Sequence, residues 1–296
     1  MQERYAWTLV SCNFTFNYNF IPTPLTCQTM ENIKIIELKK RPWVVAHRGY
    51  RAKYPENTIA AFEAAIAAEA DMIELDVCLT RDRIPVVIHD KTLDRTTNGQ
   101  GLVSAHSLAE LKELDAGSWF GAEFKGEAIP TLEELLLKIK GRITVNIEIK
   151  PESFEAPAPP DAIEVQVCEM VEKLEMADSV LISSFEHFFF GRIQRWYRDQ
   201  NISAKIRTAT LQEAPLADDF AVALCQRHQA YSYHPNECLV TPELIQLLQT
   251  EGLRIFPYTV NAEKRMEQLI KWGVNGIISD EPELLWKVIR RLQFSG

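Results

Sequence analysis

Segments rich in apolar residues alternate along the chain with amphipathic segments, and the two kinds differ in length. Short apolar runs such as Trp43–Ala46 and Val180–Ser183 are typical of strands that are buried on both faces of a sheet. Longer stretches such as Thr58–Ala70 carry many alanines and apolar residues at helical spacing. From Pro42 onward the two kinds follow one another, so the pattern predicts strands and helices in alternation.

The predicted elements cover most of this region. The predicted strands are Trp43–Ala46, Asp71–Val77, Val86–His89, Ile143–Ile149, Val180–Ser183, Ala204–Thr208, Ala230–Tyr233, Leu253–Thr259 and Val274–Ile278. The predicted helices are Thr58–Ala70, Thr131–Lys140, Asp161–Glu175, Glu186–Tyr197, Leu216–His228, Pro242–Thr250, Ala262–Trp272 and Pro282–Leu292. About eight strands separated by helices indicate an α/β protein with a parallel sheet, and so many strands favour closure into a TIM (β/α)8 barrel. An open nucleotide-binding sheet is disfavoured because no glycine-rich phosphate loop follows the first predicted strand.

One segment, at about residues 91–129, interrupts this alternation. It is irregular and follows a predicted strand that ends at His89, so it belongs to the catalytic face of a barrel. Long loops at that face are usually functional. We therefore expect a small insertion after the strand that ends at His89, and we expect this insertion to form a wall of the active-site mouth.

Length and charge limit the possible functions. A chain of 296 residues can form one large domain, and we expect residues 30–296 to be a single barrel domain. The formal net charge of −9 argues against a general nucleic-acid binder, although a pocket can still hold one phosphate group. The six cysteines form no CxxC pair, which favours scattered reduced thiols over a disulfide framework.

The first 29 residues differ in character from the rest of the chain. They are polar and aromatic, without the basic start and apolar centre of a signal peptide, and too polar to span a membrane. We expect a disordered or mis-assigned leader, with Met30 as the alternative start. The sequence contains no other segment that could cross a membrane, so we expect a cytoplasmic protein that could form a homo-oligomer.

Charged and polar residues occur at the ends of four predicted strands, where burial of an unpaired charge would be costly. These residues are His47, Arg48, Glu74, Asp76, His89, Asn146, Glu148 and Lys150. Residues two apart on a strand face the same side, so Glu74 and Asp76 point in one direction. We therefore expect a polar site at the carboxyl ends of the strands.

Three carboxylates, Glu74, Asp76 and Glu148, are expected to converge at this site. At about 4 Å each pair would repel by roughly 4 kcal/mol at an effective dielectric constant of about 20. Such crowding requires protonation or a cation, and all-oxygen ligands favour Mg²⁺ or Ca²⁺. The alternative is an internal ion-pair network of these carboxylates with Lys150 and Arg48.

The other candidate residues suit proton transfer and substrate binding. His47 and His89 can act as acid and base because histidine titrates near neutral pH. Arg48 and Lys150 can hold phosphate oxygens. Phe185 and Tyr258 follow later strands and could line a substrate pocket or fill the core.

These residues stand in an order that resembles the glycerophosphodiester phosphodiesterase family, over roughly residues 42–286. The matching segments are His47-Arg48-Gly49 with Pro55-Glu56-Asn57-Thr58, Glu74-x-Asp76, Pro85-Val86-Val87-Ile88-His89-Asp90, Leu93-Asp94-Arg95-Thr96-Thr97, Asn146-x-Glu148-x-Lys150, Thr259-Val260-Asn261 and Gly273-Val274-x-Gly276-Ile277-Ile278-x-Asp280. The long opening signature, with the later segments in the same order, makes this resemblance specific. One departure is Tyr258, where many relatives carry tryptophan, and it concerns the alcohol-side pocket.

The resemblance implies a role for each candidate. Glu74, Asp76 and Glu148 would bind one divalent metal, and His47 and His89 would be the general acid and base. Arg48 and Lys150 would contact the phosphate, and Glu56 would support the site by pairing with Arg48. The insertion after His89 would correspond to the small cap of the family, an insertion after the second strand of the barrel and before the helix that follows it.

The implied reaction is metal-dependent hydrolysis of a small-molecule glycerophosphodiester to glycerol 3-phosphate and an alcohol. A lysophospholipase D, or a phosphodiesterase for another substrate, would use the same site, and a membrane-facing apolar rim would favour the lysolipid substrate. A remote alternative is an inactive ligand-binding barrel. That alternative predicts the loss of a histidine or a carboxylate, and none is lost in this sequence.

Overall fold

The computed structural model describes residues 41–203 and 206–294. The expected leader at residues 1–29 and the alternative start at Met30 lie outside the described residues, as do residues 204–205 of one predicted strand. The strands are β1 (Trp43–Ala46), β2 (Met72–Leu79), β3 (Pro85–Val87), β4 (Thr144–Ile149), β5 (Val180–Ser184), β6 (Arg207–Gln212), β7 (Ser232–Pro235), β8 (Arg254–Ile255) and β9 (Gly276–Ser279). The α-helices are α1 (Ile59–Ala67), α2 (Leu108–Lys112), α3 (Leu132–Ile139), α4 (Ile163–Lys173), α5 (Phe188–Asp199), α6 (Asp218–His228), α7 (Pro242–Thr250), α8 (Glu263–Trp272) and α9 (Pro282–Phe294).

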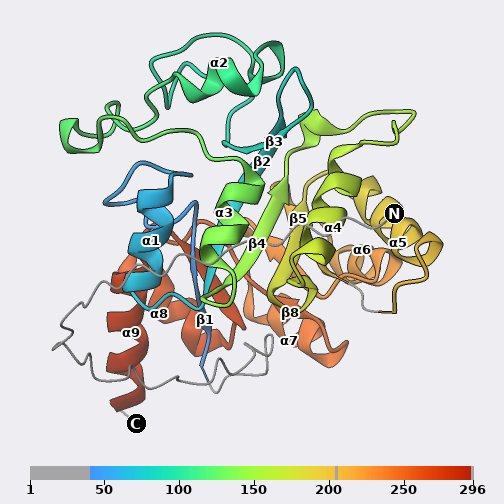
Figure 1. The fold of residues 1–296 in the computed structure, drawn as a ribbon. Coiled ribbons are helices and arrows are strands. Elements are labelled where there is room, and N and C mark those ends of the chain that lie inside the picture. Colours follow the sequence, from blue (N-terminus) through green and yellow to red (C-terminus); the bar gives the residue numbers. More distant parts are fainter. Residues whose placement is uncertain (1–40, 204–205, 295–296) are drawn as a thin grey trace, which may run out of the picture. The chain divides into compact units, whose positions relative to one another are not determined.

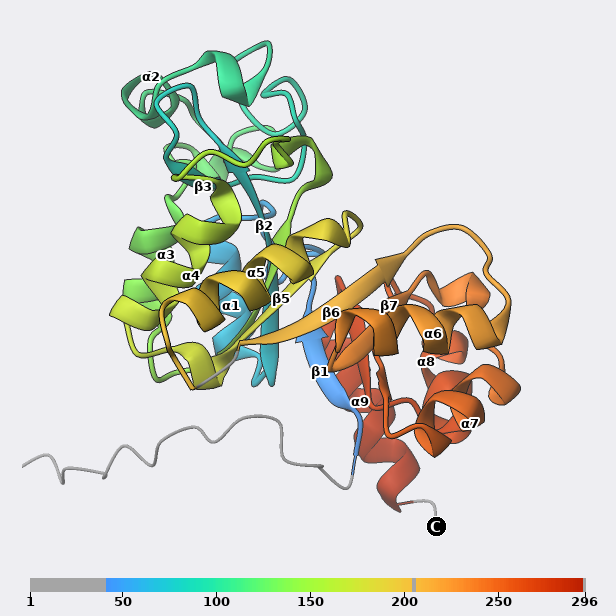
Figure 2. The same ribbon diagram turned by 90° about the vertical axis from the view of Figure 1, so that its right-hand side faces the viewer.

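The strands form the nearly closed parallel barrel that the alternation predicts. Neighbours along the sheet follow the order β8-β7-β6-β5-β4-β2-β1-β9, and each ladder between them is parallel. Backbone hydrogen bonds from Asn275 to Ile255 and from Ile278 to Pro257 join β9 to the β8 segment and bring the two ends of the sheet together. Figures 1 and 2 show helices packed around the outside of these strands.

One predicted strand has a different place from the one expected. The segment predicted as Val86–His89 contains β3, which pairs antiparallel with β2 and lies off the path of the barrel. Only residues 80–84 separate the two strands, and the backbone N–H of Thr80 donates to the carbonyl of Ile84 across the turn. Such a short connection permits a hairpin but no crossover to a parallel neighbour.

The insertion between β3 and α3 is more ordered than its sequence predicts. It contains α2, which begins at a capping box formed by Ser107 and Glu110, and two short 3-10 turns. Its buried apolar side chains, among them Leu93, Val103 and Leu111, pack against Val86 and Ile88 beside β3. Figure 1 shows the insertion as the green and cyan segment around α2 at one end of the barrel.

The apolar core has separate inner and outer parts. Inward-facing residues fill the barrel, and they are Trp43, Val45, Met72, Leu181, Ala209, Phe256 and Ile278. Outward-facing strand residues pack against the helices in two larger clusters. The fully apolar layer inside the barrel ends where the charged residues of β2 and β4 begin, so those charges lie at the carboxyl end of the barrel. No helix in residues 41–203 or 206–294 is long and apolar enough to cross a membrane.

Candidate active site

The structure brings the three predicted metal ligands together. Glu74 and Asp76 lie on β2 and Glu148 on β4, and the ladder pairs Asp76 directly with Glu148. One carboxylate oxygen of each residue lies within 4.8 Å of those of the other two, and all three side chains are buried. We call these three residues the carboxylate cluster.

Burial and mutual repulsion disfavour the charged forms of two members of this cluster. Burial and the neighbouring Asp76 carboxylate raise the pKa of Glu74 well above its ordinary value. The same two causes raise the pKa of Glu148 to about 7. Burial alone would also raise the pKa of Asp76, but the charges of Arg48 and Lys150 outweigh it and lower that pKa to about 2. Two of the three groups would therefore gain from an added cation.

The ion pairs in the cluster bear on the choice between a metal site and a purely internal network. Lys150 Nζ lies 2.7 Å from Glu148 and 3.4 Å from Asp76, and Arg48 Nε lies 3.3 Å from Asp76. Glu74 accepts a hydrogen bond from the backbone N–H of Arg48 at 2.9 Å. Among the described side chains, no basic group forms an ion pair with Glu74. Two cations thus face three carboxylates, and the donor set fits one hard divalent cation in addition.

His47 directly follows β1 and is held by an acid that directly follows β9. Its Nδ1 lies 2.7 Å from Oδ1 of Asp280, so the carboxylate favours a proton on Nδ1 and leaves Nε2 for the pocket. Burial lowers the pKa of His47, and the hydrogen bond to Asp280 raises it part of the way back. Asp280 also accepts from Arg51 and Asn261, at 2.8 and 2.7 Å, which fixes its orientation.

His89 has the same kind of partner on the other side of the site. Its Nδ1 lies 2.6 Å from Oδ1 of Asp90, and its ring borders the same pocket as His47. Burial lowers the pKa of His89, whereas the charge of Asp76 raises it. Both histidines are therefore oriented by an adjacent carboxylate at Nδ1, and their Nε2 atoms can accept or donate a proton.

Arg48 is held in place by Glu56, a buried carboxylate that lies at the centre of three arginines. Glu56 accepts from Arg48 at 2.8 Å, from Arg51 at 2.9 Å, and from both terminal nitrogens of Arg95 at 2.7 and 2.9 Å. Burial alone would raise the pKa of Glu56, but these three guanidinium groups lower it well below its usual range. Glu56 is thus a fixed anion that orients Arg48 rather than a group that touches the pocket.

The pocket itself has a volume of about 210 Å³ and collects most of the predicted residues. Both histidines, Arg48, Lys150 and two members of the carboxylate cluster line it, together with the predicted aromatic residues Phe185 and Tyr258. The two aromatic rings lie edge to face with their centres 6.0 Å apart. Glu213, which follows β6, also lines this pocket and was not anticipated from the sequence.

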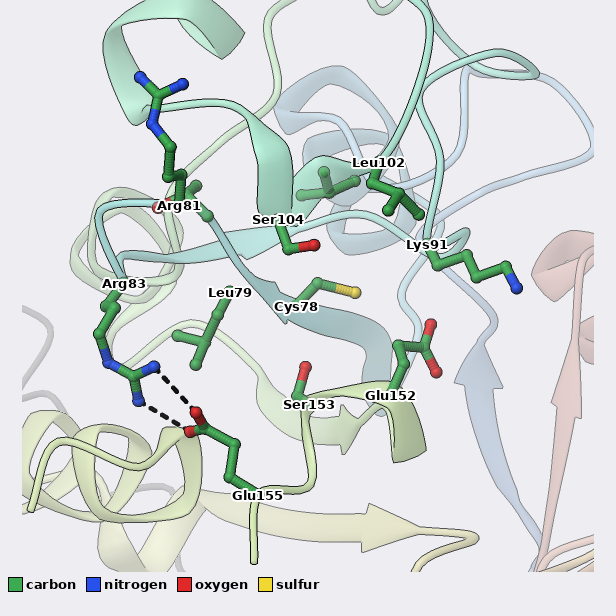
Figure 3. A pocket seen from close by; sticks show the side chains of 12 residues that line it. Cys78, Leu79, Arg81, Arg83, Lys91, Leu102, Ser104, Glu152, Ser153 and Glu155 are labelled. Carbon is green, nitrogen blue, oxygen red and sulfur yellow. Dashed lines mark hydrogen bonds and ion pairs between the residues drawn. The ribbon is translucent and has the colours of Figure 1, made fainter. Parts of the chain in front are cut away.

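A second pocket of about 340 Å³ lies between the insertion and the barrel (Figure 3). Cys78, Leu102 and Ser153 are among the residues that line it. It contains no histidine and no residue of the carboxylate cluster, and its Arg83 is bound to Glu155 at 2.8 Å. The histidines and the members of the carboxylate cluster that line a pocket are therefore found in the smaller of these two pockets.

Several residues of the site had no predicted role. Asp90, Arg95, Asn261 and Asp280 lie within the family-like segments of the sequence, but Asp280 is 233 positions from the histidine it contacts. Another is Asn57, whose Nδ2 donates to Asp76 at 2.9 Å. A signal for Asp90 was available, because an acidic residue directly after a predicted catalytic histidine is a plausible orienting partner.

The chain is similar to known proteins over most of its length. The model of the "Glycerophosphoryl diester phosphodiesterase family" matches residues 47–284. A glycerophosphodiester phosphodiesterase of Caldanaerobacter subterraneus is 41% identical over 249 residues, which are 84% of this chain and 98% of that protein. One of Bacillus altitudinis is 38% identical over 250 residues, which are 83% of this chain and 97% of that protein.

Solved structures with the same fold carry similar names. The glycerophosphodiester phosphodiesterase of Agrobacterium tumefaciens superposes with a TM-score of 0.69 at 30% identity, over 82% of this chain and 98% of that one. A phosphodiesterase of Oleispira antarctica, solved with the product sn-glycerol-3-phosphate, has a TM-score of 0.71 at 27% identity, over 84% of this chain and 97% of that one.

Proposed function

This chain belongs to the glycerophosphoryl diester phosphodiesterase family, and we propose that it hydrolyses glycerophosphodiesters to sn-glycerol 3-phosphate and an alcohol. The observation that carries the proposal is the pairing of two carboxylate-held histidines with the carboxylate cluster around one pocket. A phosphodiester is a poor electrophile, so the site must neutralise negative charge and move protons in two directions. This pocket has groups for both tasks.

Charge neutralisation falls to the basic side chains and to a divalent cation. Arg48 and Lys150 line the pocket and can bind the non-bridging oxygens of the phosphate. The carboxylate cluster would hold the cation, Mg²⁺ or Ca²⁺, which supplies further positive charge to the phosphate when bound. Glu56 keeps the guanidinium of Arg48 in place, as the ion pair between them indicates.

Proton transfer falls to His47 and His89. One Nε2 takes a proton from the attacking hydroxyl, and the other histidine gives a proton to the oxygen of the leaving alcohol. Asp280 and Asp90 hold the two rings by their Nδ1 atoms, so each ring presents Nε2 to the substrate. The geometry permits either assignment of acid and base.

The attacking hydroxyl can belong to water or to the glycerol group next to the ester. The second route would form a cyclic phosphate before glycerol 3-phosphate appears. A substrate analogue that lacks this glycerol hydroxyl distinguishes the two routes, because equal turnover of the analogue excludes the cyclic intermediate.

A lysophospholipid is the second candidate substrate, and one observation favours it. Phe188 and Phe220 are 69% and 66% exposed, and they lie in the first turns of α5 and α6. Helix starts follow the carboxyl ends of the strands in this fold, so both rings lie on the face of the barrel that bears the pocket. Release of choline from lysophosphatidylcholine, at a rate similar to that from glycerophosphocholine, would support this substrate.

The direct test is a product assay on the purified protein. It is incubated with glycerophosphocholine, glycerophosphoethanolamine and glycerophosphoglycerol in the presence of Mg²⁺ or Ca²⁺, and glycerol 3-phosphate is measured by a coupled dehydrogenase reaction. We expect release of glycerol 3-phosphate from at least one of these esters. Absence of the product with every ester and every metal would refute the proposed function. The expected cytoplasmic location and homo-oligomer stay predictions, to be checked by cell fractionation and light scattering.

A further inference from the structure

The active-site pocket contains one carboxylate that the proposed reaction does not use. Glu213 directly follows β6, which lies four strands from β1 in the barrel order and thus on the opposite side of the eight-stranded ring. Its two oxygens accept hydrogen bonds from Asn236 at 3.0 Å and from the hydroxyl of Tyr258 at 2.9 Å. In the described part of the chain no basic side chain forms an ion pair with Glu213, so its charge faces the pocket unneutralised by the protein.

The surroundings of Glu213 differ from those of the carboxylate cluster. The cluster is buried and forms ion pairs with Arg48 and Lys150. Glu213 is exposed, forms no ion pair with a described basic side chain, and lines the pocket together with Tyr258 and Phe185. The hydroxyl of Tyr258 donates to Glu213, and its ring lies edge to face with the ring of Phe185. An oriented carboxylate next to aromatic faces is an arrangement that attracts a cation, and an ammonium group in particular.

The two sides of the pocket therefore have opposite preferences. The side with Arg48 and Lys150 favours the negative phosphate, and the side with Glu213 favours positive charge. We propose that Glu213, together with Tyr258 and Phe185, selects glycerophosphodiesters whose leaving alcohol carries an ammonium group, such as esters of ethanolamine or choline. This inference rests on the proposed function, since it assigns the alcohol end of the same substrate.

A different use of Glu213 would leave a different signature. Its oxygens could instead accept hydrogen bonds from the hydroxyl groups of the glycerol end. Every substrate of the enzyme carries that end, so Glu213 would then favour all esters equally. Selectivity between a charged and an uncharged alcohol separates the two roles.

The test compares two esters of nearly identical shape. Glycerophosphocholine carries a trimethylammonium group, and the 3,3-dimethylbutyl ester of glycerol phosphate carries a neutral carbon in its place. The measured quantity is the ratio of kcat/KM for the two esters. We expect this ratio to be about 3 to 10 in the unmodified protein, because an exposed ion pair and a cation–π contact each contribute modestly.

The Glu213→Gln variant should reduce this ratio by about half or more, and the part that remains is the cation–π contribution of the aromatic rings. The matched control is Glu152→Gln, which removes the same charge from an exposed glutamate in the second pocket, labelled in Figure 3. The control should keep the ratio of the unmodified protein. Tyr258→Phe retains the ring but removes the hydroxyl that orients Glu213, so it should give an intermediate ratio. Because both substrates are assayed on one preparation, a partly unfolded variant still gives a valid ratio.

The outcomes are distinct. A ratio unchanged by Glu213→Gln, an equal loss for both esters, or a loss of selectivity in Glu152→Gln would each overturn the inference and leave the proposed function in place. If the unmodified protein releases glycerol 3-phosphate from neither ester nor from any other glycerophosphodiester, the proposed function fails, and this inference fails with it. A decline in the ratio with added salt, seen in the unmodified protein and absent in Glu213→Gln, is the second expected result.

Discussion

Replacement of Asp280 by asparagine should impair turnover strongly, and the structure indicates how. Asp280 accepts from Arg51 and Asn261 through Oδ2 and contacts His47 through Oδ1. In Asp280→Asn the two outside donors require the amide oxygen at the Oδ2 position, so the amide nitrogen must face His47. The imidazole would then have to accept at Nδ1, and its proton would move to Nε2.

In this tautomer the proton of His47 is on Nε2. A general base needs a lone pair at that atom, and a general acid needs the imidazolium form, which has then lost its carboxylate partner. Where a carboxylate that orients a catalytic histidine is neutralised in this way, the loss in kcat is on the order of 10⁴-fold. The loss of a charge-assisted hydrogen bond alone, at about 1.5–3 kcal/mol, would cost roughly 10- to 150-fold. We expect Asp280→Asn to lie between these limits, with a KM that changes much less than kcat.

The pH dependence of kcat supplies a second measurement. The contacts of His47 predict the direction in which this profile moves in Asp280→Asn. The hydrogen bond and the charge of Asp280 raise the pKa of His47, so their loss lowers that pKa. If His47 is the general base, the acid limb of the kcat profile moves to lower pH. If it is the general acid, the alkaline limb moves to lower pH. The limb that moves therefore identifies the role of His47, and Asp90→Asn should move the other limb through His89.

Melting temperature and circular dichroism serve as the fold control, because Asp280 is buried and also holds Arg51. A folded Asp280→Asn protein with near-normal kcat and an unmoved profile would refute the orienting role. A loss confined to KM would assign Asp280 to substrate binding instead.

Three further predictions concern the metal, the histidines and the turn after β1. Chelation should abolish turnover and added Mg²⁺, Ca²⁺ or Mn²⁺ should restore it, and Glu148→Gln should require far more metal; full activity in excess chelator, with no metal by elemental analysis, would refute the metal site. His47→Ala and His89→Ala should each lower kcat by roughly 10²–10⁴-fold on choline esters, and the proton donor should matter less with a nitrophenyl ester, whose leaving group departs without a proton. Gly49→Ala should lower the free energy of unfolding by about 1–3 kcal/mol, because Gly49 has φ +84° and a Cβ there would lie 2.7 Å from the backbone of Ala61; chemical denaturation measures it, and an unchanged midpoint would contradict the strain.

The barrel and its catalytic edge could be predicted from the sequence because both depend on local patterns. Buried parallel strands are apolar on both faces, so a charged residue in such a strand stands out, as Glu74, Asp76 and Glu148 do. Residues two apart share a face, which places Glu74 beside Asp76 without knowledge of the fold. The ladder then brings Glu148 next to them, and this depended only on β2 and β4 being neighbours.

The place of β3 and the order within the insertion were harder to predict. The segment at residues 85–89 looks like any other buried strand, and its apolar pattern does not report direction. The length of the preceding connection does, since residues 80–84 are too few for a crossover. Helix α2 has only five residues, and its stability depends on its capping box and on the packing of Leu111 rather than on a long amphipathic pattern.

The partners of the catalytic groups could not be inferred by pattern alone. Asp280 meets His47 because β9 and β1 are neighbours in the barrel, although the two residues stand near opposite ends of the chain. Glu213 had no distinguishing feature in the sequence, since an acidic residue in a loop is most often a solvated surface group. Its importance follows only from the contacts with Asn236 and Tyr258, which hold it at the pocket.

The insertion is tied to the chemistry by one of its own side chains, which changes the role expected from its position. The sequence suggests a wall around the mouth, but Arg95 binds both Glu56 and Asp90, at 2.7 and 2.6 Å. Glu56 orients Arg48, and Asp90 orients His89. The guanidinium of Arg95 thus connects Arg48, which we propose to bind phosphate, to His89, which we propose to transfer a proton. A buried carboxylate such as Glu56 is stable only with its full set of partners, so the insertion must be folded for Arg48 to be held in position.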